Sequence, residues 1–252
     1  MIGSMEPLTF AALACAGFAG GFINAAVGSG TLITYPALLA AGIPPVAANG
    51  TNTAGLSPGS FASAWAYRAE LRGRMSRLRF PLVATVVGAA LGATLVVALP
   101  SRVFVAVVPW LVGTATVLVA VQPILARKVR EHRSGGAHSV WPWTGVIGIY
   151  GGYFGAAQGV MLMAALGLVY DNDPQRSNGA KNILAAAANV TAAVVFALAG
   201  AVVWLAALAV AVGSIPGGYV GGRVARLLPG QVLRGLVVVV GIGATLYLVL
   251  PR

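Results

Sequence analysis

Charged residues are scarce in this sequence. Only 8% of its 252 residues are charged and 58% are apolar, whereas a soluble globular domain has about 25% charged residues to face water. The chain therefore has too few charges to cover a soluble protein of this size. A bilayer core about 30 Å thick is crossed by roughly 20 helical residues, so the uncharged stretches predict about eight crossings. These stretches are 7–67, 80–101, 103–126, 139–170, 182–222 and 235–251.

Acidic residues, histidine and cysteine are rarer still. Cys15 is the only cysteine, which excludes disulfide scaffolds and cysteine-ligated metal sites. An intramembrane protease, a metalloenzyme or a carboxylate proton relay needs His, Asp or Glu inside the membrane, and no predicted span contains one. There is also no phosphate-binding loop for ATP. We therefore expect no enzymatic activity, no cofactor and no bound metal. The acids are Glu6, Glu70, Glu131, Asp171 and Asp173.

Basic residues give the chain a net charge of +11. Many of them lie in two segments, 68–79 and 127–138, and the second segment also holds both histidines, His132 and His138. Lys and Arg concentrate in this way in the cytoplasmic loops of membrane proteins. The pattern favours a lipid bilayer over nucleic acid as a partner. The first residues, MIGSMEPLTF, lack the basic start of a cleaved signal peptide, so we expect the first span to be retained.

Glycine and proline divide the apolar stretches into predicted helices. Gly28-Ser29-Gly30 interrupts the first stretch, and a glycine-rich region around Gly159 interrupts a later one. Pro45 and Pro174 suit the first turn of a helix, and Asp173 suits the N-cap position before Pro174. The predicted helices cover 9–27, 31–41, 45–68, 80–99, 103–125, 143–158, 160–170, 174–198, 202–222 and 231–250.

The two halves of the sequence repeat each other. GGFINAAVG from Gly20 matches GGYFGAAQG from Gly151, and PVAANGTNT from Pro45 matches PQRSNGAKN from Pro174. A weaker match sets Gly88-xxx-Gly92 on Gly213-xxx-Gly217, with Pro100 on Pro229. Three matches in the same order indicate an internal duplication, and the substrate site of duplicated transporters lies between the repeats.

The predicted fold is therefore an all-α polytopic transmembrane bundle of about eight spans, in two repeated halves with glycine-broken helices. Its parts are an N-terminal repeat (1–126), a basic cytoplasmic loop (127–140) and a C-terminal repeat (141–252). The orientation of the repeats stays open. Four spans per half make the repeats parallel but place Arg223, Arg226 and Arg234 outside, against the positive-inside rule. Re-entrant segments at 31–41 and 160–170 would change that count.

Lys181 is the one basic residue expected inside the hydrocarbon. It lies seven residues after Pro174, about 10 Å along the helix. An ionisable group at that depth costs about 2.5–3.5 kcal/mol and indicates function. The competing interpretation is that its long side chain reaches the headgroups. Its place in the repeated motif, with Asn52 as its counterpart, favours a functional role.

Uncharged hydrogen-bond donors accompany Lys181 in both copies of the motif. Broken helices expose backbone groups, which are tolerated in a membrane only when they are buried or line a cavity, and helix N-termini at such breaks favour anions. The competing interpretation is that these side chains merely connect helices. The predicted substrate-binding residues are Lys181, Asn49, Thr51, Asn52, Asn178, Asn182, Gln158, Asn24, Gly28, Ser29 and Gly30.

The order of short motifs in the first half is also informative: Gly17-x-x-x-Gly21, Gly28-x-Gly30, Pro36-x-Leu38, Gly42-x-Pro44 and Ala48-x-Gly50-Thr51. In this order, and across essentially the whole chain, the sequence resembles the sulfite exporter TauE/SafE permease family. The second half departs from the pattern, since Gln158-Gly159-Val160 replaces a richer glycine run and Ala180 stands where Thr51 would recur. The resemblance implies a permease, commonly one that exports sulfite or organosulfonates.

We therefore expect an inner-membrane permease that exports a small sulfur-containing anion through a site between two repeats. The expected partners are the small anion and the bilayer, and a homo-oligomer is left open. Two alternatives remain at this stage. A transporter of another small solute or metal ion is disfavoured by the lack of acids, histidine and cysteine in the spans. A non-transporting membrane subunit leaves the paired polar motifs at glycine breaks unexplained.

Overall fold

A computed structural model describes residues 5–73, 75–131, 140–170, 173–224, 227 and 230–249. These residues form ten α-helices and no strand, so the prediction of an all-helical protein is confirmed. Those of the first half are α1 (Pro7–Ala26), α2 (Thr31–Ala40), α3 (Pro45–Ala66), α4 (Met75–Ala98) and α5 (Ser101–Glu131). Those of the second half are α6 (Trp141–Tyr153), α7 (Gln158–Val169), α8 (Pro174–Leu198), α9 (Trp204–Val224) and α10 (Gly230–Val249).

Local signals placed several helix ends correctly. α3 and α8 begin at Pro45 and Pro174, and the Asp173 carboxylate accepts a hydrogen bond of 2.9 Å from the backbone N–H of Gln175. The predicted N-cap is thus confirmed.

Other helix ends were predicted wrongly. α4 begins at Met75, within the predicted basic loop 68–79, and Arg77 and Arg79 in its first turns stay exposed. α5 runs on to Glu131, into the other predicted basic loop. α6 ends at Tyr153 instead of residue 158, because Gly155 adopts a φ of 76°. His132, His138, Asp171, Arg226 and Pro229 lie outside the described residues.

The length and apolar composition of the helices indicate a multi-pass membrane protein. Six helices among the described residues are long and apolar enough to cross a membrane, namely α1, α4, α5, α8, α9 and α10. α3 has 22 residues but is less apolar, because its buried face carries Asn, Thr and Ser side chains. The expected number of about eight spans stays a prediction.

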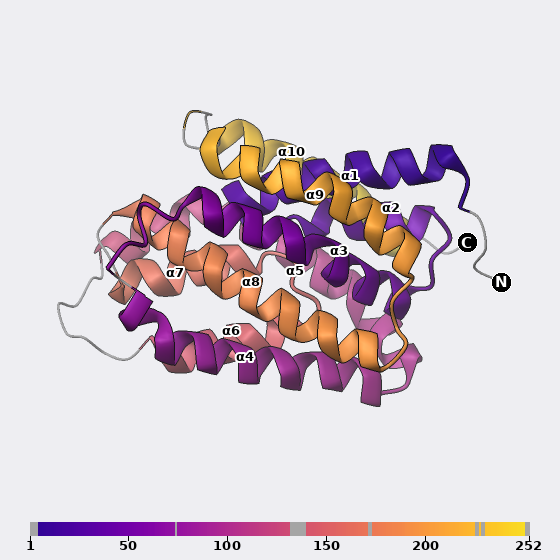
Figure 1. Cartoon of the computed structure of the whole chain (residues 1–252), viewed down its shortest axis with the longest axis horizontal. Coiled ribbons are helices and arrows are strands. Elements are labelled where there is room, and N and C mark those ends of the chain that lie inside the picture. Colours follow the sequence, from indigo (N-terminus) through magenta and orange to yellow (C-terminus); the bar gives the residue numbers. More distant parts are fainter. Residues whose placement is uncertain are drawn as a thin grey trace.

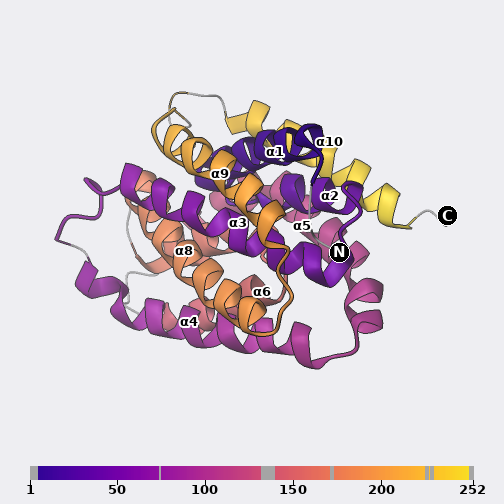
Figure 2. The ribbon, with the colours of Figure 1, turned by 45° about the vertical axis from the view of Figure 1, so that its right-hand side comes forward.

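The helices lie roughly along the long axis of the molecule (Figure 1). In both views α1, α9 and α10 form the upper part, α4 and α6 form the lower part, and α3 and α8 lie between them (Figures 1 and 2). α3 and α8 are therefore the central helices, and they carry most of the buried polar side chains.

Two helix pairs turn back on themselves. Thr34 of α2 packs against Gly20 of α1, so α2 returns alongside α1 after the break at Gly28 to Gly30. Val140, just before α6, and Leu166 near the end of α7 lie in one apolar cluster. α1 with α2, and α6 with α7, thus form two helical hairpins whose tips lie inside the protein.

Glycine faces hold two pairs of parallel helices at close range. Gly17 and Gly21 of α1 lie against Val210 and Ser214 of α9. In the same way Gly148 and Gly152 of α6 lie against Thr85 and Ala89 of α4. Small residues let helix backbones approach closely inside a membrane. Each hairpin therefore docks on a long helix from the other half of the chain.

Two other pairs of helices run antiparallel. Gly50 of α3 packs on Phe196 of α8, whereas Tyr67, just after α3, binds Asn178 near the start of α8. Likewise Gly113 of α5 lies by Thr245 and Thr116 lies by Gly241 of α10. α3 is thus antiparallel to α8, and α5 is antiparallel to α10.

Substitution of Gly213 is expected to destabilise the protein strongly. A Cβ atom there would overlap the Ala14 carbonyl of α1, a backbone group that cannot move aside. Gly213→Leu should cost at least the upper end of the roughly 1–3 kcal/mol typical of overpacking. Thermal unfolding in detergent measures this, with Gly243→Leu as the control because Gly243 has nothing within 4 Å. Equal melting temperatures for both variants would contradict the proposed packing.

Candidate functional site

The two helix breaks meet in the interior of the protein. The backbone N–H of Gly159, at the start of α7, donates a hydrogen bond of 3.0 Å to the Gly28 carbonyl. A Cβ atom on either glycine would overlap the other's backbone, and Gly28 has a φ of 88°, which side-chain-bearing residues rarely adopt. Glycine is required at this crossing for both reasons.

Lys181 binds the end of α1. Its side chain is 0% exposed, so it does not extend to the headgroups. Its Nζ donates hydrogen bonds of 3.2 Å to the Asn24 carbonyl and 2.9 Å to the Ala25 carbonyl. Carbonyls in the last turn of a helix lack partners within the helix and carry partial negative charge. A cation from α8 therefore caps the point where α1 breaks.

Asparagines of α3 bind the other broken ends. The Asn49 amide donates a hydrogen bond of 2.9 Å to the carbonyl of Tyr153, the last residue of α6. The Asn52 amide donates one of 3.1 Å to the Thr31 hydroxyl at the start of α2 and accepts another from Thr34. These side chains satisfy helix ends that no water in a bilayer core would reach.

Several donors near the breaks remain without an acceptor. An ammonium group has three N–H donors, and two of those of Lys181 are used. Among the described residues the third has no acceptor. Polar atoms of Ser29, Gln158 and Asn182 are also buried with no partner. Buried donors are normally paired because an unpaired one costs roughly 1–3 kcal/mol, so this group has the character of a binding site.

Two predicted site residues lie away from the breaks. The Thr51 hydroxyl accepts a hydrogen bond of 2.9 Å from the backbone N–H of Val203, which precedes α9. The Asn178 amide donates one of 2.7 Å to the Tyr67 hydroxyl. Asn49 and Tyr67 are 18 residues apart, which is about 27 Å along a helix. The two Asn-Gly motifs therefore lie far apart, because α3 and α8 run antiparallel.

A polar contact that the sequence did not predict joins the three helices around the site. The Ser60 hydroxyl accepts hydrogen bonds of 3.2 Å from Asn24 of α1 and 2.9 Å from Asn189 of α8. The spacing of Ser57, Ser60 and Ser63 along α3 was an available signal, since residues three apart share a helix face.

No carboxylate balances the charge of Lys181 in the described part of the chain. Glu6, Glu70 and Asp173 lie outside the helices and Glu131 is the last residue of α5, and no group of His, Cys, Asp and Glu in this part of the chain is arranged to hold a metal ion. The site is closed to solvent, since Asn49 and Asn52 are at most 1% exposed. The donors and the positive charge of this arrangement can hold an anion.

Stability measurements can distinguish the role of Asn52 from that of Asn182. Asn52→Ala should lower the free energy of unfolding by about 1–3 kcal/mol, because it leaves Thr31 and Thr34 without their partner. Asn182→Ala should change stability much less, since the Asn182 amide nitrogen has no partner to lose. Denaturation in detergent compares them, and a larger loss for Asn182→Ala would show that its donor has a structural role.

Comparison with known proteins agrees with this architecture. The profile of the family described as "Sulfite exporter TauE/SafE" matches residues 13–248. A "Probable membrane transporter protein" of Haemophilus influenzae is 30% identical over 91% of this chain and 90% of its own length. The "Probable membrane transporter protein ORF9" of a Sinorhizobium species is 30% identical over 97% of this chain and 95% of its own.

A third relative is the "Probable membrane transporter protein YfcA" of Escherichia coli, which is 27% identical over 94% of this chain and 88% of its own length. No solved structure matches. Since the family profile covers most of the chain, the resemblance drawn from the glycine and proline motifs is confirmed. The chain belongs to the sulfite exporter TauE/SafE family of membrane transporters.

Proposed function

We propose that this transporter exports a small sulfur-containing oxyanion, sulfite or an organosulfonate, through the paired helix breaks. The observation that carries the proposal is the fully buried ammonium of Lys181, which has a free donor and no carboxylate partner among the described residues. The positive charge suits an anion, and the donors of Ser29, Gln158 and Asn182 suit its several oxygens.

The energetics favour an anion that moves in and out of this site. A buried, unpaired charge is costly, and a partner of opposite sign offsets that cost. α2 and α7 begin at the breaks, and their N-termini add partial positive charge there. A metal ion or other cation as substrate is disfavoured, because Lys181 already occupies the α1 carbonyls that would coordinate it.

The proposal includes an inverted relation between the two halves. The packing of α1 on α9 has a counterpart in that of α6 on α4, and the corresponding helices α3 and α8 run antiparallel, as do α5 and α10. Antiparallel partners are expected when the twofold axis lies in the membrane plane. Each half then contains one re-entrant hairpin and three crossings.

The packing supports the sequence alignment. Gly88 faces the Gly145 carbonyl and its repeat partner Gly213 faces the Ala14 carbonyl, which makes Ala14 and Gly145 equivalent at a shift of 131 residues. The GGFINAAVG and GGYFGAAQG motifs match at the same shift. The match from Pro45 and Pro174 keeps its shift of 129, since both prolines begin their helices.

The distribution of arginine supports an orientation. Arg68, Arg72, Arg127, Arg176 and Arg223 lie where α3, α5 and α9 end and where α8 begins, which is the left end of Figure 1. The positive-inside rule makes this end cytoplasmic, and this includes Arg223, which a parallel repeat would place outside. In the inner membrane, an anion leaving a negative interior gains about 2.3 kcal/mol per charge for each 100 mV.

Transport assays in proteoliposomes test the substrate and Lys181 together. Sulfite flux should exceed that of taurine, which carries its own ammonium group, and Lys181→Gln should reduce flux to background because it removes the charge. The Gln amide can still donate to the Asn24 and Ala25 carbonyls, so folding should persist. Lys128→Gln is the control, since Lys128 is the only other lysine and lies near the end of α5. Unchanged flux in Lys181→Gln would show that Lys181 serves only as a helix cap.

Single cysteines test the orientation of the halves. In a Cys15→Ala background, Ala69→Cys follows α3 and Ala199→Cys follows α8, and both positions are exposed. Inverted repeats place them on opposite sides of the membrane, so an impermeant maleimide added to intact cells should label only Ala199→Cys. Labelling of both or of neither from outside is the result expected for parallel repeats.

A further inference from the structure

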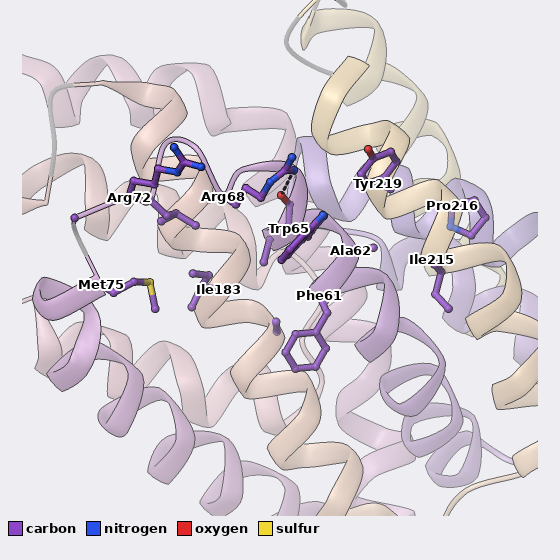
Figure 3. A pocket seen from close by; sticks show the side chains of 14 residues that line it. Phe61, Ala62, Trp65, Arg68, Arg72, Met75, Ile183, Ile215, Pro216 and Tyr219 are labelled. Atoms are coloured by element: carbon purple, nitrogen blue, oxygen red, sulfur yellow. Dashed lines mark hydrogen bonds between the residues drawn. The ribbon is translucent and has the colours of Figure 1, made fainter.

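An apolar groove runs along the outside of the bundle toward its arginine-rich end (Figure 3). It has a volume of about 990 Å³ and lies between α3, α8 and α9. Its walls include Phe61, Trp65, Ile183 and Ile215, and of these Phe61 is 56% and Trp65 is 63% exposed. Such large exposed apolar surfaces face lipid in a membrane protein, so the occupant of the groove is expected to be apolar over most of its length.

A second cavity continues the groove at its arginine-rich end. It has a volume of about 460 Å³ and is lined by Arg68, Arg72, Glu70 and Arg223, with Ala66 and Ala69. Arg68 and Arg72 line both cavities. An apolar channel thus leads into a polar space with three arginines and one glutamate.

The guanidinium groups of this second cavity are positioned by aromatic rings. The Arg68 guanidinium lies 5.0 Å from the centre of the Trp65 ring and donates a hydrogen bond of 3.2 Å to the Trp65 carbonyl. The Arg223 guanidinium lies 4.5 Å from the centre of the Tyr219 ring. Each guanidinium has five N–H donors in a fork that matches phosphate oxygens, so most donors stay available.

We propose that the groove is a binding site for an anionic phospholipid. The acyl chain lies along Phe61, Ile183 and Ile215, and the phosphate binds Arg68 and Arg72, with Arg223 beside it. Arg68 lies just past the end of α3 and seven residues after Phe61, so about 10 Å of acyl chain follows the phosphate into the bilayer. Basic pockets between helices bind such headgroups at the cytoplasmic side. The proposal does not depend on which anion is transported.

Native mass spectrometry of the purified full-length protein tests this site. After delipidation, the protein is titrated with phosphatidylglycerol and, separately, with phosphatidylethanolamine of the same acyl chains. Phosphatidylglycerol should bind more tightly. Arg68→Gln and Arg72→Gln should each weaken it about fivefold, and together about 25-fold, because each surface cation contributes a similar attraction.

The matched control is Arg79→Gln. The Arg79 guanidinium also stacks on a ring, 5.0 Å from the centre of Phe80, at the same end of the bundle but outside both cavities. The Arg79→Gln substitution should leave lipid affinity unchanged. Ala62→Trp, which fills the groove without changing any charge, should weaken binding of both lipids.

Three results would overturn the proposal: equal affinity for the two lipids, unchanged phosphatidylglycerol binding in the double arginine variant, or equal losses in the double variant and Arg79→Gln. Displacement of the bound lipid by glycerol phosphate alone would also do so, because it would assign the arginines to a soluble anion. Sulfite flux measured on the same variants keeps this site separate from the transport proposal, which fails only on flux.

Discussion

Broken helices inside a membrane leave backbone groups that only the protein can satisfy, and the rest of this structure depends on that constraint. α1 stops near Gly28, and the exposed carbonyls of its last turn are bound by Lys181 of the other half. α6 stops at Tyr153, and its last carbonyl is bound by Asn49 of the first half. Each half of the chain thus caps the broken helix of the other. Neither hairpin would be stable in lipid without this exchange, so the two halves interlock.

The same exchange links stability to transport. Each hairpin docks on its long helix through a glycine face, which allows close backbone packing. Lys181 is fully buried in this arrangement, so in the proposed mechanism a substrate reaches it only if one hairpin moves. Movement of a hairpin tip also changes the partners of its capping side chain. In the proposed mechanism an arriving anion compensates Lys181 at that moment, which couples occupancy of the site to the motion.

Local sequence signals predicted much of the fold but little of the packing between helices. Pro45, Pro174 and Asp173 marked helix starts because proline and a capping carboxylate act within one turn. The breaks were visible as glycine runs for the same reason. The pairing of Asn178 with Tyr67 was not visible in the sequence, because it depends on the direction of α8 relative to α3.

The two helix breaks differ in the side chains that bind them. At the position where α8 supplies Lys181, α3 supplies the neutral Asn52, which is fully engaged by Thr31 and Thr34. The first break therefore has both a cation and a cap, whereas the second relies on the neutral Asn49. In the proposed mechanism a bound anion is drawn toward Lys181 at the end of α1, while Gln158 at the start of α7 offers only an uncharged donor. In the proposed duplication, the difference between Asn52 and Lys181 confines the positive charge to one side of the crossing.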